Sequence, residues 1–209
     1  MGNICILTDS TAQFLQPNFP GQNHIDIIPL NIHLNGSFIR DSNFKAKNLP
    51  PLVDSHHCPR LISPTPEELR STIIRISQRY DEVLGIFLSS RLNNFYTIIQ
   101  EVVSSLGENS RIQVIDSQAI SAGLGFIVQS CAQQLHQNAS FAELERLACS
   151  FIPRIYSIFY LPGLSYLHFN GHLDHAQATI GEMLGMLPTY GLEEGGLTPL
   201  EKMRNQRHT

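Results

Sequence analysis

The chain has 209 residues, of which 42% are hydrophobic and 15% are charged, and its formal net charge is −4. This is the composition of a globular protein long enough to bury a substantial core in one or two domains. Its Lys and Arg residues do not gather into the basic patch that marks nucleic-acid binding, and no apolar stretch approaches the roughly 18 residues of a membrane span. We therefore expect no nucleic-acid partner and no stable membrane insertion.

The cysteines and the N-terminus indicate a cytoplasmic protein. None of the four cysteines forms a CxxC pair, and two of them lie inside apolar runs, as free thiols do in a reducing compartment. The first ten residues carry no basic segment and already contain Asp9, which is unlike a signal peptide.

The first predicted elements are strands. Residues 3–8 are a short apolar run, which predicts a buried strand. Residues 25–34 partly alternate and predict a second strand, near a sheet edge or a bend because of Pro29. Asn35-Gly36 then predicts a hairpin turn. Residues 41–64 are polar and rich in proline, which indicates little regular structure.

Helices and strands alternate in the next part of the chain. Thr65-Pro66-Glu67-Glu68 has the residues of a helix start, with Thr65 as N-cap and a helix to about residue 80. Ser140-Phe141-Ala142-Glu143 has the pattern of a capping box. The elements predicted between them are a strand at 82–88, a helix at 94–106, a strand at 111–115 and a helix that follows Gly123 and Gly125 to about residue 137.

The pattern changes after residue 155. The sequence predicts a strand at 157–161, helices at 163–169 and 174–184, and a hairpin at 189–198 that turns at Glu194-Gly195-Gly196. We therefore expect an α/β fold with a mostly parallel sheet and helices on both faces in residues 1–155. Residues 156–209 are expected to form a smaller, incomplete second α/β domain.

Polar residues follow three of the predicted strands. They are Asp9-Ser10-Thr11, Ser89-Ser90 and Asp116-Ser117. The carboxyl ends of parallel strands share one edge of a sheet, where α/β proteins bind ligands. The sequence therefore predicts a binding site at this edge, and Ser89-Ser90, just before a predicted helix, are expected to offer hydroxyl and N–H groups together.

Other sites are weaker interpretations of the same residues. His168, His172 and His175 have helical spacing for a metal, but Gly171 interrupts the run, and His56-His57-Cys58 has no matching partner. A hydrolase triad built from Ser10 or Ser90 with Asp116 lacks the GxSxG elbow. Gly123-Leu124-Gly125 lacks the third glycine of a dinucleotide site. We predict no metal and no catalytic residue.

Several motifs, in order over essentially the whole chain, resemble the DegV family. They are Leu7-Thr8-Asp9-Ser10-Thr11, Ile28-Pro29-Leu30, Ser63-Pro64-Thr65-Pro66-Glu67-Glu68-Leu69, Leu88-Ser89-Ser90-Arg91-Leu92 with Tyr96, Ile115-Asp116-Ser117, Ser121-Ala122-Gly123-Leu124-Gly125, the segment from Leu164 to His172, Pro188 and Lys202-Met203-Arg204. The resemblance implies a two-domain carrier, not an enzyme, that binds one long-chain fatty acid between its domains and presents it to a separate fatty acid kinase subunit.

The resemblance also implies where the head group binds. The family's head-group serine matches Ser90, and His172 stands where the family has arginine. Besides the bound fatty acid no cofactor is expected. The predicted ligand-binding residues are Ser90, Ser89, Ser63, Thr65, Asp9, Ser10, Asp116, Ser117 and His172.

The sequence departs from the family pattern at some of these places. Leu61 and Ile62 replace a Thr-Ser pair, His172 replaces a permanent cation, and the chain ends soon after Lys202-Met203-Arg204. The alternative is therefore a divergent interaction or structural protein that keeps the fold without binding lipid. Apolar residues of 156–187, if left exposed, would favour a homo-oligomer.

Overall fold

The computed structural model describes residues 2–40, 49, 53–107, 111–160, 163–183 and 186–204. The chain divides into two compact units. Unit 1 comprises residues 1–30, 63–156 and 194–196, and unit 2 comprises residues 31–62, 157–193 and 197–209. The sequence predicted a domain boundary near residue 155. In the structure, residues 31–62 belong to unit 2 and residues 194–196 belong to unit 1.

The sheet of unit 1 has four parallel strands in the order β2-β1-β6-β7. They are β1 (Ile4–Asp9), β2 (Ile25–Ile28), β6 (Glu82–Phe87) and β7 (Ile112–Asp116), and a short 3-10 helix, η1 (Gln22–His24), precedes β2. All six residues of β1 are buried, whereas the edge strands β2 and β7 are mostly half-buried. A central parallel strand is covered on both faces, which explains its continuous apolar run.

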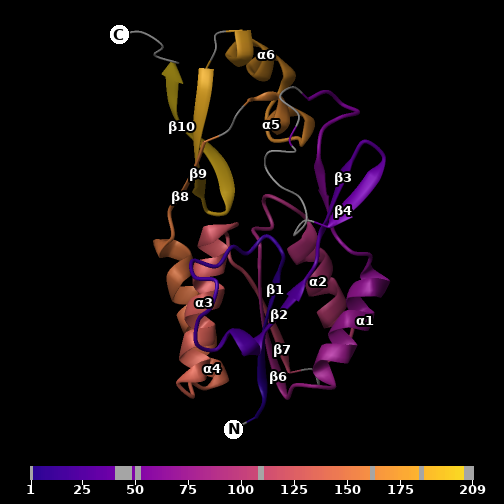
Figure 1. The fold of residues 1–209 in the computed structure, drawn as a ribbon, viewed down its shortest axis with the longest axis vertical. Helices are drawn as coiled ribbons and strands as arrows, with labels where there is room; N and C mark the ends of the chain where they lie inside the picture. Colours follow the sequence, from indigo (N-terminus) through magenta and orange to yellow (C-terminus); the bar gives the residue numbers. More distant parts are fainter. Residues whose placement is uncertain are drawn as a thin grey trace. The chain divides into compact units, whose positions relative to one another are not determined.

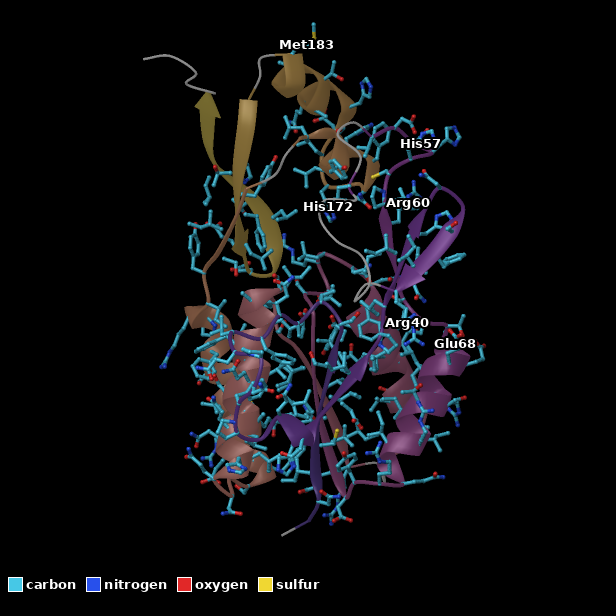
Figure 2. All side chains as sticks on the ribbon, viewed as in Figure 1. Arg40, His57, Arg60, Glu68, His172 and Met183 are labelled. Carbon is cyan, nitrogen blue, oxygen red and sulfur yellow. The ribbon has the colours of Figure 1, made fainter. Side chains whose placement is uncertain are left out.

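Four helices cover this sheet, α1 and α2 on one side and α3 and α4 on the other (Figure 1). They are α1 (Pro66–Ser77), α2 (Phe95–Ser104), α3 (Ala122–His136) and α4 (Phe141–Phe151), which runs on into a 3-10 turn, η4 (Ile152–Arg154). The capping boxes of Thr65 with Glu68 and of Ser140 with Glu143 are both formed. These local signals place the helix starts where the sequence predicted them, and Figure 2 shows Glu68 at the start of α1.

Unit 2 contains two small antiparallel sheets. One has the order β4-β3-β5, from β3 (Asn31–Leu34), β4 (Ser37–Arg40) and β5 (Arg60–Ile62), and the other has the order β10-β9-β8, from β8 (Ser157–Tyr160), β9 (Met186–Glu193) and β10 (Gly196–Arg204). Helices α5 (Ser165–Phe169) and α6 (His175–Met183) belong to the same unit. Leu164, Leu167, Ala178 and Tyr190 form a buried apolar cluster there.

The predicted second strand at 25–34 is in fact two strands in different sheets. Its first half, β2, pairs with β1, and its second half, β3, pairs with β4 and β5. Pro29 lies at the break, since it has no N–H to donate to a continuous ladder. The Asn35-Gly36 turn is confirmed, with φ values of 52° and 74°, which are typical of a two-residue hairpin. Among the described residues no helix is long and apolar enough to cross a membrane.

Candidate functional site

The strand order places a switch point at the carboxyl ends of β1 and β6. The chain leaves β1 for β2 on one side of it and returns on the other side with β6 and β7. In open α/β sheets, ligands bind at the point where the strand order reverses in this way. The three polar segments that the sequence predicted lie at the ends of β1, β6 and β7 and in the loops that follow them, and all three belong to unit 1.

Asp9 ties two of these loops together from inside the protein. Its carboxylate is fully buried and accepts from the Leu88 N–H at 2.8 Å and from the Thr11 N–H at 2.9 Å. The Thr11 hydroxyl also donates to it, at 2.5 Å. Hydrogen bonds to a charged acceptor in a buried site are among the strongest in proteins. Asp9 therefore fixes the end of β6 against the end of β1.

Ser10, next to Asp9, is partly exposed but also forms hydrogen bonds with the main chain of neighbouring residues. Its Oγ accepts from the Leu30 N–H at 2.9 Å, and its own N–H donates to the Ile28 carbonyl at 3.1 Å. These bonds fix the loop after β1 to the end of β2. The Ser10 hydroxyl proton makes no contact among the described residues, so Ser10 retains one donor.

Ser89 is buried and fully occupied by internal contacts. Its hydroxyl donates to the Gly195 carbonyl at 2.6 Å and accepts from the Arg91 N–H at 3.2 Å. The Ser89 N–H donates to the Ala119 carbonyl at 2.9 Å. Ser89 therefore joins the loop after β6 to the loop after β7 and to the turn 194–196.

Ser117 has a comparable internal role in the loop after β7. It is 1% exposed, and its hydroxyl both accepts from the Ala119 N–H at 3.1 Å and donates to the Ala119 carbonyl at 3.2 Å. Two non-glycine residues in or just beyond this loop, Gln118 and Ser121, have positive φ values of 51° and 58°. Such strained residues persist where the surrounding contacts determine the backbone.

Ser90 and Asp116 are hydrogen-bonded to each other at the carboxyl edge of the unit 1 sheet, and both are partly exposed. The Ser90 hydroxyl donates to Asp116 Oδ2 at 2.5 Å, and the Ser90 N–H lies 3.3 and 3.4 Å from the two carboxylate oxygens. Asp116 Oδ1 also accepts from the Gln118 N–H at 3.0 Å. Both Ser90 and Asp116 are half-buried, so this pair can meet a ligand.

The loop between β6 and α2 agrees with the sequence prediction to within one residue at each end. Helix α2 begins at Phe95, and the N–H groups of Leu92 and Asn93 turn back to the Ser89 carbonyl at 3.1 and 3.2 Å. Ser90 therefore lies several residues before the first residue of α2. A separate turn precedes the helix.

The remaining predicted residues lie in other places. The Ser63 hydroxyl donates to Asn93 Oδ1 at 3.2 Å and so contacts the loop after β6. The hydroxyl of the exposed Thr65 accepts from the Glu68 N–H as the N-cap of α1. His172 belongs to unit 2, where it follows α5 (Figure 2), and partial burial lowers the pKa of its imidazole. Unlike an arginine, His172 therefore carries no permanent positive charge.

The sequence did not indicate that Arg91 and Gly195 contact the residues at the carboxyl edge of the sheet. The guanidinium of Arg91 donates from Nη1 to the Glu194 carbonyl at 3.3 Å. Gly195 has a φ of 78° and lies against Ser89 and Gln118. The signal for the turn at 194–196 was present in the sequence, but nothing local indicated what it contacts.

The metal interpretation finds no support among the described residues, where no group of three or more His, Cys, Asp or Glu side chains is arranged to hold an ion. The rings of His168 and His175 lie 5.1 Å apart, and His168 Nδ1 is 3.1 Å from the Leu173 carbonyl. His168 and His175 therefore pack against each other within unit 2.

A family model described as "Uncharacterised protein, DegV family" matches residues 3–209. The chain belongs to the DegV family. A DegV domain-containing protein of Caldanaerobacter subterraneus is 27% identical over 208 residues, which are 99% of this chain and 74% of that protein. The resemblance drawn from the motifs is thereby confirmed, and so is the α/β fold with a parallel sheet between helices.

Two solved DegV structures give this fold a context. A DegV family protein from Thermus thermophilus, described for its fatty acid binding, is 26% identical with a TM-score of 0.77, over 97% of this chain and 72% of that one. The Fatty Acid Kinase B3 protein of Streptococcus pneumoniae, loaded with linoleic acid, is 18% identical with a TM-score of 0.78, over 97% of this chain and 73% of that one. At that identity the second likeness concerns the fold alone.

Proposed function

We propose that this DegV protein binds a long-chain fatty acid with its head group beside Ser90, at the carboxyl edge of the unit 1 sheet. The observation that carries the proposal is the Ser90–Asp116 pair, partly exposed at the switch point of a DegV fold. The fatty acid binding of the 26% identical relative supports the same ligand class. The other hydroxyls of the edge, on Ser89 and Ser117, are buried and hold the loops that position Ser90.

The fatty acid is a ligand in this proposal, and the protein acts as a carrier rather than an enzyme. Burial of an acyl chain contributes about 0.8 kcal/mol per CH₂ group, so the tail supplies most of the affinity and the head group supplies orientation. We further propose that the carrier presents the acid to a separate fatty acid kinase in the cytoplasm.

The direct test compares two serine variants. Ser90→Ala should weaken linoleic acid binding by about tenfold, since it removes a hydroxyl that contacts a charged or acidic head group. Ser71→Ala is the matched control, because Ser71 is exposed on α1 and its hydroxyl donates to the Glu67 carbonyl at 2.9 Å. Equal affinity of Ser90→Ala and the parent chain would show that the head group lies elsewhere.

A second candidate is an interaction protein that keeps the fold and binds no lipid. It is favoured by large apolar side chains exposed in unit 2, where Ile158 is 61%, Ile180 58% and Met183 82% exposed. Large apolar side chains left exposed are more typical of interaction surfaces than of the remaining protein surface. A homo-oligomer that forms in the absence of fatty acid, together with no detectable acid binding, would select this candidate.

A further inference from the structure

The hydroxyl of Ser90 offers a head group an acceptor, not a donor. Its proton goes to Asp116 Oδ2 at 2.5 Å. Within the described part of the chain, Asp116 accepts from the Ser90 hydroxyl, the Ser90 N–H and the Gln118 N–H. Because the Ser90 proton is directed at Asp116, the lone pairs of Ser90 Oγ are what this hydroxyl offers a ligand.

The main chain around Ser90 has no N–H group to offer in place of the hydroxyl. Every N–H from residue 89 to residue 93 already has an acceptor inside the protein. The acceptors are the Ala119 carbonyl for Ser89, the Asp116 carboxylate for Ser90, Ser89 Oγ for Arg91, and the Ser89 carbonyl for Leu92 and Asn93. This loop therefore differs from an oxyanion-binding loop, in which free N–H groups converge on the ligand.

The charged groups near the pair do not supply a fixed partner for an anion. Asp9 on β1 is a buried carboxylate, and burial together with the charge of Asp116 raises the pKa of Tyr96 on α2, which stays a neutral phenol. Arg91, on the loop after β6, is exposed and its Nη1 donates to the carbonyl of Glu194 in the turn 194–196, whose own side chain is acidic. Asp9, Glu194, Arg91 and Tyr96 are the titratable or charged residues that the described contacts bring to this edge.

We propose that a bound fatty acid and Asp116 hold one proton between them, so that binding takes up a proton from solution. This inference rests on the proposed function. An atom in hydrogen-bond contact with Ser90 Oγ lies no more than about 5.5 Å from Asp116 Oδ2. Two carboxyl groups this close do not both stay ionised in a partly buried site. The shared proton lets the head group donate to Ser90, while Asp116 keeps its bond from the same hydroxyl.

Isothermal titration calorimetry measures the number of protons taken up on binding. Linoleic acid, kept below its aggregation concentration, is titrated into the protein at pH 7.5 in phosphate and in Tris, whose ionisation enthalpies differ. We expect an uptake of about one proton per bound acid, and a Kd that rises about tenfold per pH unit above the pKa of the free acid. Tight binding with no proton uptake and a pH-independent Kd would overturn the inference. It would mean that a cation such as Arg91 pairs with an ionised head group.

Two variants and one analogue identify the group responsible. Asp116→Asn keeps an acceptor for Ser90 without the charge, so proton uptake should fall to about zero and the pH dependence should disappear. Glu101→Gln, which changes an exposed carboxyl group on α2, should behave as the parent chain. Linoleyl alcohol has an O–H donor and no charge, and should bind with no pH dependence. Uptake that persists in Asp116→Asn contradicts the inference, whereas failure of the parent chain to bind either lipid contradicts the proposed function itself.

Discussion

Gly195→Ala should destabilise the protein by about 3 kcal/mol, and the structure separates two contributions to this loss. Gly195 has a φ of 78°, which costs an alanine about 1 kcal/mol. A Cβ at this position would also collide with Ser89 Oγ and lie 3.2 Å from Gln118 Cα. To relieve the collision, the turn must give up the buried Ser89–Gly195 hydrogen bond, which costs about 2 kcal/mol.

A matched glycine isolates the second contribution. Gly36 has a φ of 74°, and a Cβ there would meet nothing within 4 Å, so Gly36→Ala should lose only about 1 kcal/mol. Urea unfolding followed by far-UV circular dichroism gives both values, since the chain contains no Trp for fluorescence. Equal losses in the two variants would refute the argument. Ser89→Ala added to Gly195→Ala removes the colliding oxygen and should cause little further loss.

Three further predictions concern the interior and one helix cap. Asp9→Ala should lower the free energy of unfolding, measured by urea denaturation, by about 3 kcal/mol, because it leaves the N–H groups of Leu88 and Thr11 without their acceptor. A loss below about 1 kcal/mol would contradict this prediction. Burial raises the pKa of the Cys5 and Cys131 thiols to about 12. A thiol reagent at pH 8 should therefore label the exposed Cys149 first, and should label Cys5 and Cys131 only after denaturation. Early labelling of Cys5 or Cys131 in the folded protein would contradict this prediction. Ser140→Ala should cost about 1 kcal/mol through the lost capping box of α4, and an unchanged urea midpoint would exclude that role.

Local sequence signals account for most of unit 1. The capping boxes at Thr65 and Ser140 are set by residues three apart, and the apolar run of β1 follows from its central position in a parallel sheet. By contrast, the fate of residues 31–62 depends on pairing between distant segments, such as Asn31 with Ile62. No periodicity within residues 25–34 indicates that the two halves join different sheets.

The arrangement of the candidate residues at this edge could be predicted from the sequence in outline and not in detail. Alternation of strands and helices was enough to bring Asp9, Ser90 and Asp116 to one edge, because parallel strands end together. It was not enough to distinguish residues that face a ligand from residues that hold the loops. Ser89 is buried, and its hydroxyl donates to the carbonyl of Gly195, which lies 106 positions away in the sequence. The neighbouring Ser90 stays partly exposed, and only the folded chain shows this difference.

The central claim, that this DegV protein carries a fatty acid, is tested most directly by native mass spectrometry. The protein is purified from a bacterial host, weighed intact, and extracted with organic solvent so that any released lipid can be identified. We predict a complex with one long-chain fatty acid per chain, which Ser90→Ala retains less well than Ser71→Ala. A clean apo mass that incubation with linoleic acid leaves unchanged would contradict the carrier function and favour the interaction protein.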